Sequence, residues 1–285
     1  MTRQQADDTW WLGVAVAAFA VIAGETVMVL GQAPLRAAWL QFLALTLAAA
    51  TFPLMSLGVE RAMRRPLATL WLCVLALLLT LLFGPELQGV RQGAGLPGAM
   101  IHVSHLIAPL AIGVAARRPG PAPAAGLAAL SLGLALQPDA AALIALTAAL
   151  GVLLATQRNG WTAVALGAAS LAATWTLFHP ALIPPVSWVE RMPGTALEME
   201  LWLGFLVALG LCLMPMPFVF IAVQGRRRRS LAGALAAYWI GLIGVSLIGA
   251  FPTPLVGYGV SAILGYVLSW ALLRVGVPVA SARQR

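Results

Sequence analysis

Long hydrophobic segments separated by short polar stretches make up most of this chain. The first begins at Trp10, after a polar N-terminal stretch, and continues to about Leu30. A helix needs about 20 apolar residues to cross the hydrocarbon core of a bilayer, so a segment of this kind predicts a transmembrane helix. The segments do not alternate between polar and apolar residues as the strands of a membrane β-barrel do. The pattern therefore predicts an all-α, polytopic integral membrane protein.

One hydrophobic segment is too long for a single crossing. The chain is almost continuously apolar from Ala124 to Ala155, and the main polar interruption is Gln137-Pro138-Asp139. Proline interrupts the hydrogen bonds of a helix, and the neighbouring aspartate can cap the helix that follows. We therefore predict a turn at residues 137–139 that joins two membrane helices.

With this turn, the chain divides into ten predicted spans within a single domain, residues 1–285. The first span lacks a small-residue cleavage signature near its end, so we interpret it as an uncleaved helix rather than a signal peptide. The predicted spans are residues 10–30, 37–58, 67–84, 100–116, 122–137, 139–156, 160–178, 199–223, 231–250 and 255–275.

The distribution of arginine supports this topology. Cytoplasmic loops of membrane proteins carry an excess of positive charge. With both termini in the cytoplasm, fourteen of the seventeen arginines lie on the inner side, and only Arg36, Arg91 and Arg191 lie outside. Without the turn at residues 137–139, Arg158 and the run Arg226–Arg229 would fall on the outer side. The charge pattern thus supports ten spans in a multi-pass membrane protein.

Composition narrows the function classes. The chain is 61% hydrophobic with a mean hydropathy of +0.93, and only 9% of its residues are charged, against about 25% in soluble proteins. A net charge of +8 would suggest nucleic acid for a soluble protein. Here the charges follow the loops, so we expect membrane lipids as partners and no nucleic acid. Cys73 and Cys212 lie in apolar segments and indicate no disulfide or metal framework.

Two stretches resemble motifs of the SEDS family, named for bacterial shape, elongation, division and sporulation. Residues 137–139 resemble the family's Gln-Pro-Asp turn between its fifth and sixth spans, at the same ordinal place. Residues 251–261, Phe-Pro-Thr-Pro-Leu-Val-Gly-Tyr-Gly-Val-Ser, resemble the family's closing motif, a proline-rich turn followed by Ser-Tyr-Gly-Gly-Ser and the last span. The matching residues are Pro254, Tyr258, Gly259 and Ser261.

A third stretch, from Gly89-Val90-Arg91 to Ser104-His105-Leu106, resembles the family's Gly-Ala-Arg-Arg-Trp … Pro-Ser-Glu-Leu segment. It keeps one arginine and lacks the second arginine, the tryptophan, the proline and the glutamate. Family members polymerise the sugar strand of peptidoglycan from lipid II, usually beside a penicillin-binding protein. The resemblance therefore implies a lipid-linked cell-wall precursor as substrate. It also implies a penicillin-binding protein, or another divisome or elongasome component, as partner.

The resemblance also directs attention to one carboxylate. The family's essential aspartate lies in a large outer loop after the seventh span, and this chain has no aspartate there. Glu190 is the nearest substitute, and it would act as the general base that deprotonates an acceptor sugar hydroxyl. The alternative is a solvated loop charge paired with neighbouring Arg191.

Five further residues are substrate-binding candidates. Arg91 would bind the pyrophosphate of a lipid-linked donor, because a guanidinium matches phosphate oxygens; alternatively, it is an interfacial arginine near lipid headgroups. Gln137 and Asp139 would orient a lipid-linked sugar, or they only form the turn and the helix cap. Tyr258 and Ser261 come from the closing motif.

For a few other polar residues, the sequence allows both a functional and a purely structural role. Glu25 lies inside the first span, where an ionisable group is a functional candidate, unless it reaches the outer interface. His102 and His105 are spaced to share a helix face and can converge on a metal or haem iron. No cofactor is evident beyond such a divalent metal, because no further His or Cys cluster accompanies the pair. Pro215 and Pro217 predict a kink in the eighth span.

Taken together, we predict a divergent SEDS-like protein of peptidoglycan synthesis, cell shape or cell division. It would act on a lipid-linked sugar precursor as a glycosyltransferase or a relative of one. Two alternatives stay open: a non-catalytic membrane partner within a cell-envelope complex, and a transporter of a lipid or small molecule, for which no internal repeat is evident.

Overall fold

The computed structural model describes residues 10–86, 91, 93–96, 99–180, 188–224, 228–249 and 251–276. Within these residues, six helical spans are long and apolar enough to cross a membrane. They are α2 (Trp10–Leu30), α5 (Pro66–Phe83), α8 (Ala140–Gln157), α9 (Gly160–Phe178), α13 (Arg229–Ile248), and an interrupted span formed by α11 (Leu201–Leu213) and α12 (Met216–Gln224).

Four further apolar segments complete the bundle. Helices α3 (Leu35–Ala50) and α4 (Phe52–Arg64) form one bent pair. Three shorter apolar helices are α6 (Val103–Arg117), α7 (Pro121–Leu136) and α14 (Val260–Val275). These segments fall where the ten spans were predicted, and the fold class, a polytopic helical membrane protein, is confirmed.

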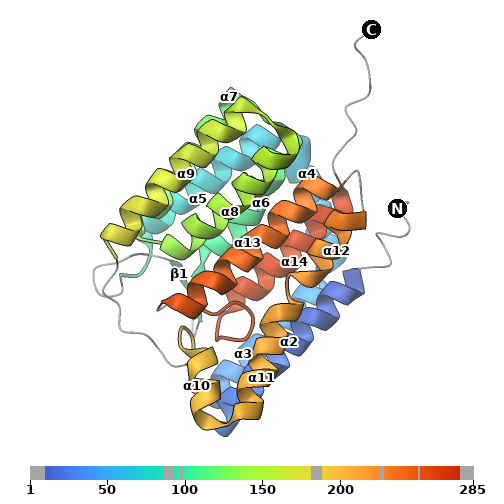
Figure 1. Ribbon diagram of the computed structural model, residues 1–285, viewed down its shortest axis with the longest axis vertical. Coiled ribbons are helices and arrows are strands. Elements are labelled where there is room, and N and C mark those ends of the chain that lie inside the picture. The colour runs from blue at the N-terminus through green and yellow to red at the C-terminus, as the bar shows by residue number, and fades with distance from the viewer. Residues whose placement is uncertain are drawn as a thin grey trace.

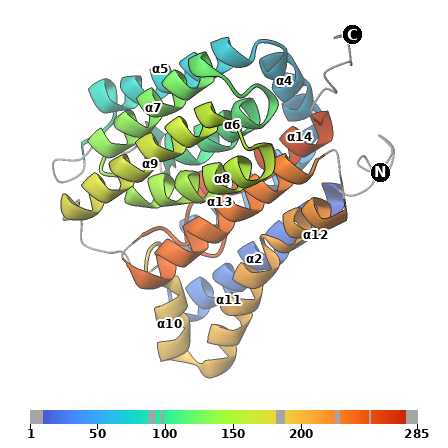
Figure 2. The ribbon, with the colours of Figure 1, turned by 45° about the horizontal axis from the view of Figure 1, so that its top comes forward.

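Helix α14 lies in the middle of the bundle and packs against α2, α3, α4 and α6. On one side of it, α13 packs along α8. Helix α8 in turn packs against α9, α9 against α7, and α7 against α5 (Figures 1 and 2). On the other side, α2 packs against α11. The rings of Trp10, at the start of the described chain, and Phe52 are stacked, and the Arg274 guanidinium near its end lies over the same Phe52 ring. The described chain thus begins and ends at the same end of the bundle.

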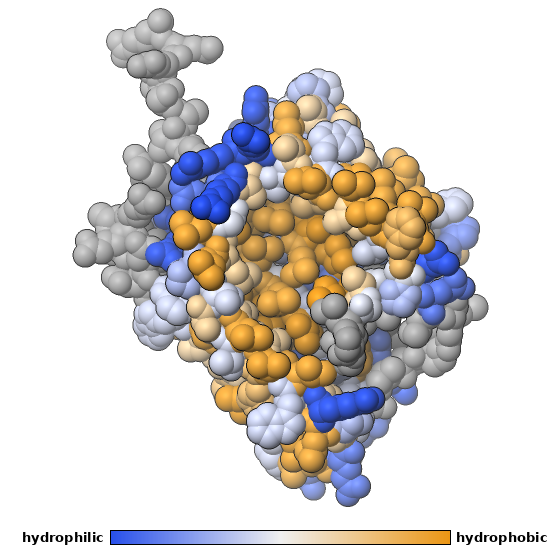
Figure 3. All heavy atoms as spheres, turned by 180° about the vertical axis from the view of Figure 1, so that it is seen from behind, coloured by the Kyte–Doolittle hydropathy of each residue, from blue (hydrophilic) through white to orange (hydrophobic). Residues whose placement is uncertain are grey.

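The surface of the bundle is apolar. Large hydrophobic side chains such as Phe83, Leu171, Phe178 and Ile248 are more than 70% exposed. Figure 3 shows a face that is mainly hydrophobic and hollowed near its middle, with hydrophilic side chains gathered toward its rim. Soluble proteins rarely expose apolar patches of this extent, so this surface faces lipid.

The second predicted span, residues 37–58, is not one straight helix. The chain bends by 65° between α3 and α4. Pro53 lies in the first turn of α4, where it has no N–H to continue the hydrogen bonds of α3. At the end of α3, the N–H and the hydroxyl of Thr51 both donate to the carbonyl of Leu47, over 2.8 and 2.6 Å. The bend was not predicted, because the apolar pattern continues through Pro53.

The eighth predicted span is interrupted as its prolines indicated. Helix α11 ends at Leu213 and α12 begins at Met216, so the break falls at Pro215. The Tyr266 hydroxyl on α14 donates to the carbonyl of Met214 at this break, over 2.8 Å. A neighbouring helix therefore satisfies a backbone group that the proline disturbs.

Two elements at the outer end were not predicted. Strands β1 (Gly93–Leu96) and β2 (Ala99–His102) form an antiparallel hairpin, with Gly93 opposite His102. The fourth span therefore begins at Val103 rather than at residue 100. The short helix α10 (Met192–Met199) occupies the end of the predicted outer loop, and the eighth span begins after it, at Leu201 rather than at residue 199.

Candidate functional site

The three stretches that resemble SEDS motifs meet at the outer end of the bundle. The backbone N–H of His102, at the end of the hairpin, donates to the Ser261 hydroxyl at the start of α14 over 2.8 Å. Electrostatic interaction joins His102 in turn to Asp139 in the turn between α7 and α8. Segments far apart in the sequence thus build one polar region, which we call the outer cluster: His102, His105, Asp139, Tyr238 and Ser261.

The Asp139 carboxylate makes two kinds of interaction in this region, a helix-capping hydrogen bond and electrostatic interactions with nearby side chains. Its carboxylate accepts a hydrogen bond from the N–H of Ala142 over 2.9 Å, which confirms the predicted cap of α8. The same carboxylate interacts electrostatically with His102, His105 and Tyr238. A single residue therefore begins a helix and supplies negative charge to the outer cluster.

The two histidines lie side by side, with ring centroids 5.9 Å apart. His102 lies before the membrane helix, and burial lowers its pKa, while the Asp139 carboxylate acts in the opposite direction. His105 is buried, and the part of the chain that the structure describes offers no hydrogen-bond partner to its Nδ1 atom. Buried polar atoms are usually hydrogen-bonded, so an atom of this kind can receive a ligand or a water.

Tyr238 on α13 adds a third polar group that the sequence did not single out. The side chain is fully buried, and among the described residues its hydroxyl has no hydrogen-bond partner. The residue lies within a long apolar span, where a lone tyrosine is indistinguishable from a packing residue. Only its spatial relationship to Asp139 identifies it.

A glycine on α14 brings the histidine helix close. A Cβ atom at Gly265 would lie 2.2 Å from the backbone carbonyl oxygen of His105, a distance that two such atoms cannot adopt. The absence of a side chain at Gly265 therefore allows α14 to contact the backbone of α6 directly. This contact fixes the depth at which His105 lies in the bundle.

The closing motif holds the segment that carries Glu190. The N–H of Thr253 donates to the Val189 carbonyl over 2.9 Å, and the N–H of Tyr258 donates to the Trp188 carbonyl over 2.7 Å. Glu190 follows directly and is partly buried. Burial raises the pKa of the Tyr258 hydroxyl, and the positive charge of Arg36 lowers it. The predicted base is thus anchored through its neighbours to the motif that contains Ser261.

Gln137 turns into the bundle. Its side-chain amide donates to the Thr80 hydroxyl on α5 over 2.5 Å, and the side chain is 1% exposed. This contact ties the end of α7 to α5 and positions the turn that contains Asp139. The interpretation of Gln137 as a turn residue therefore has direct structural support, while contact with a substrate stays a prediction.

Arg91 lies at the base of the hairpin. Its guanidinium donates to the Leu82 carbonyl over 2.7 Å and forms an ion pair with Glu86 at 3.1 Å. Next to its partners Leu82 and Glu86 along the chain, the end of α5 and strand β1 line an open surface cavity of about 470 Å³, which includes the exposed side chains of Leu79 and Phe83. Thr80, the partner of Gln137, also lines this cavity. An arginine beside an apolar cavity suits a ligand with an anionic head and a hydrocarbon chain.

The described residues do not support a metal centre. No group of three or more His, Cys, Asp or Glu side chains among them is arranged to hold a metal ion.

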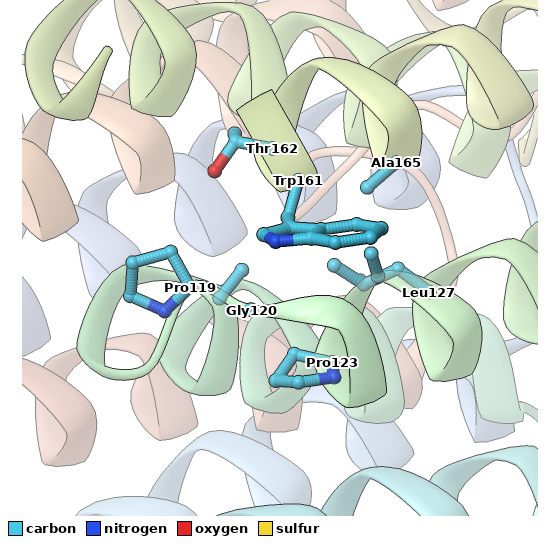
Figure 4. Close-up of a pocket in the computed structure, with 9 residues that line it drawn as sticks. Pro119, Gly120, Pro123, Leu127, Trp161, Thr162 and Ala165 are labelled. Carbon is cyan, nitrogen blue, oxygen red and sulfur yellow. The ribbon is translucent and has the colours of Figure 1, made fainter. Parts of the chain in front are cut away.

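A second cavity, between α9 and the start of α7, has a volume of only about 10 Å³, which is room for roughly one water. Figure 4 shows the Trp161 ring lying in this region near Pro123 and Leu127.

Taken together, the helical bundle has a SEDS-like fold. The crystal structure of the rod shape determining protein RodA from Thermus thermophilus matches with a TM-score of 0.69 at 17% identity, covering 93% of this chain and 95% of RodA. A mutant of that protein matches with a TM-score of 0.66 at 16% identity, with 93% and 96% coverage.

A further structure comes from a study of the coordination of polymerization and crosslinking by a peptidoglycan synthase complex. It matches with a TM-score of 0.64 at 19% identity, covering 93% of this chain and 96% of its own. No model of a protein family matches the sequence. No curated protein matches it either. The predicted resemblance to the SEDS family is therefore confirmed at the level of the fold.

Proposed function

We propose that this chain is a bacterial inner-membrane protein of peptidoglycan synthesis that binds a lipid-linked sugar precursor at its outer end. One observation carries the proposal: the three SEDS-like stretches converge in the outer cluster, in a bundle that shares its fold with RodA over 93% of the chain. Buried polar groups in a membrane bundle are costly to maintain and are usually functional.

The proposed substrate contacts divide between two neighbouring places. The cavity beside α5 would accept part of the hydrocarbon chain. Arg91 donates to the Leu82 carbonyl and forms an ion pair with Glu86, and it would exchange this ion pair for one with the pyrophosphate. Asp139, Tyr258 and Ser261 would orient the sugar of the precursor. The buried side chains of His105 and Tyr238 would support this region from within the bundle.

If the protein is a glycosyltransferase, Glu190 is the proposed base. An acceptor hydroxyl would attack the anomeric carbon of the donor as the bond from that carbon to the pyrophosphate oxygen breaks. Glu190 would take the hydroxyl proton, and the lipid pyrophosphate would leave with the bonding electrons. A misplacement of about 1 Å can cost roughly a hundredfold in rate, so the anchoring of residues 188 and 189 by the closing motif matters.

One observation favours a non-catalytic role instead. The outer segment after α9 contains no aspartate, although the resemblance implies an essential one there. In that case the protein would serve as a membrane partner in a cell-envelope complex. A penicillin-binding protein is the proposed partner in both cases, and the similarity to a chain from a peptidoglycan synthase complex supports it.

Polymerisation of purified lipid II by the isolated protein tests the proposal, with Glu190→Gln alongside and Glu198→Gln as an exposed control on α10. The catalytic form predicts polymer from the wild type and from the control, and none from Glu190→Gln. Equal polymer from all three would remove Glu190 from the mechanism. Binding of lipid II without polymer, even with a partner present, would identify the non-catalytic role. Lipid flux across proteoliposomes without either result would indicate a transporter.

A further inference from the structure

The first span and the bent second span are joined by a buried polar pair outside the outer cluster. Glu25 on α2 is 3% exposed and Gln41 on α3 is 0% exposed. The Gln41 side-chain amide donates to the Glu25 Oε1 atom over 2.9 Å. The sequence left open whether Glu25 reaches the outer interface, and in the structure its side chain is enclosed by protein rather than exposed.

The two remaining oxygens of this pair are both buried, and the described residues supply no hydrogen bond to either of them. They are Oε2 of Glu25 and Oε1 of Gln41. An ionised carboxylate and an amide oxygen can only accept hydrogen bonds, so neither can satisfy the other. Leaving two buried acceptors unsatisfied is costly, and leaving one of them charged within a membrane bundle is costlier still.

One added proton would satisfy both of these acceptor oxygens. A proton on Oε2 of Glu25 turns that atom into a donor, and the unsatisfied Oε1 of Gln41 is the matching acceptor. The carboxylic acid and the amide then exchange two hydrogen bonds in opposite directions, and no charge stays buried. We propose that Glu25 carries a proton in the folded protein, and that Glu25 and Gln41 together form a proton-binding site between the first two spans.

Among the described residues, Glu25 has no counter-charge. The elements packed against α2 are α3, α10, α11 and α14, and the closing motif also contacts it. The ionisable side chains of these parts are Arg36, Glu198, Cys212, Tyr258, Tyr266 and Arg274. Within the described part of the chain, none of these forms a hydrogen bond or ion pair with Glu25, whose one hydrogen-bond partner is Gln41. A proton is therefore the means of neutralisation that the pair itself accommodates.

The Glu25–Gln41 pair lies next to the closing motif. A Cβ atom at Gly24 would lie 1.9 Å from the Val256 carbonyl oxygen, so the backbone of the motif rests on α2 one residue before Glu25. The proton at Glu25 thus stabilises the helix pair that supports the anchor of the Glu190 segment. This role does not depend on the substrate or on catalysis.

Infrared difference spectroscopy on the full-length protein in lipid nanodiscs at about pH 7 tests the proposal, since an unperturbed glutamate is ionised there. We expect the C=O absorption of a protonated carboxylic acid in the wild type. Glu25→Gln, which retains an amide in place of the acid, should abolish this absorption without lowering the melting temperature. Gln41→Leu should shift the absorption, because it removes the partner. Glu60→Gln, which alters the exposed Glu60–Arg64 pair, should leave it unchanged.

A pH series on the same samples provides a second readout. A proton held in the folded state and released on unfolding makes stability fall as the pH rises, and Glu25→Gln should remove this component. The absence of an acid absorption in the wild type would overturn the proposal. So would an absorption that persists in Glu25→Gln, or an acid absorption that sodium chloride removes at constant pH, since a bound cation would then neutralise Glu25.

Discussion

At the scale of single residues, the outer cluster depends on side chains that are small or absent as much as on those that are polar. Gly265 allows α14 to reach the backbone of His105, and the Ser261 hydroxyl at the start of the same helix accepts from the N–H of His102. Both contacts hold the histidine pair against α14. The chemistry of the site therefore rests on close backbone packing.

Gly265→Ala should destabilise the protein by about 1–3 kcal/mol or more, because the added methyl group would meet a backbone atom that cannot rotate away. Gly167→Ala is the matched control: Gly167 lies within a helix, and a Cβ atom there would meet nothing within 4 Å. The control should be neutral or slightly stabilising, as Ala favours helix. Thermal unfolding of both variants in detergent measures the difference, and equal melting temperatures would contradict the described contact.

His102 predicts a dependence of stability on pH. Burial lowers its pKa in the folded protein, so the unfolded chain binds the proton more tightly. Stability is then complete above about pH 6.5, the ordinary value for histidine, and falls as the pH drops below it. His102→Gln should weaken this dependence, as measured by melting temperature against pH. His179→Gln, at an exposed ring that contacts the Trp175 carbonyl, should preserve it.

At the scale of elements, two interruptions of the membrane helices fall at prolines, Pro138 and Pro215, and neighbouring elements compensate for the lost hydrogen bonds. The turn at residues 137–139 is closed by the Asp139 cap and by the contact of Gln137 with Thr80. At the break between α11 and α12, the Tyr266 hydroxyl donates a hydrogen bond to the Met214 carbonyl. These interruptions are therefore stable features of the bundle.

Tyr266→Phe should cost about 1–2 kcal/mol, because it leaves the Met214 carbonyl at the break without its donor. Tyr238→Phe is the matched change: the Tyr238 hydroxyl has no hydrogen-bond partner among the described residues, so its loss should cost under about 0.5 kcal/mol. Thermal unfolding of the two variants gives the comparison. A larger loss in Tyr238→Phe than in Tyr266→Phe would contradict the account of the break.

The sequence predicts most of these elements, because the length of an apolar segment and the side that carries arginine are local properties. The turn at residues 137–139 is predicted in this way. The 65° bend at Pro53 is missed because the apolar pattern continues through it. The hairpin of β1 and β2 is missed because its first strand, Gly-Ala-Gly-Leu, has no alternation to indicate a strand.

The candidate site is less predictable than the fold. Asp139, Arg91 and the closing motif are found from the sequence, as is the spacing of His102 and His105. Their convergence, and the addition of Tyr238, result from contacts between segments over 100 residues apart in some cases, such as His102 with Ser261. No local pattern encodes such contacts.

At the scale of the whole molecule, the chain shares its fold with RodA at 17% identity over nearly its full length. The apolar surface suits a lipid environment (Figure 3), and the outer cluster joins segments that lie far apart in the sequence. We propose that this cluster recognises a lipid-linked sugar precursor. Asp139 is its charged member and links the turn to both histidines.

The dissociation constant of lipid II for the purified protein in nanodiscs, compared with that for Asp139→Asn, tests this claim most directly. Asparagine caps a helix as well as aspartate does, so the variant removes the charge and keeps the turn. Glu198→Gln serves as the control for a charge lost elsewhere on the outer side. Binding should be at least about tenfold weaker in Asp139→Asn, equivalent to roughly 1.4 kcal/mol, and unchanged in the control. Equal affinity of wild type and Asp139→Asn, with both proteins folded, would contradict this proposal.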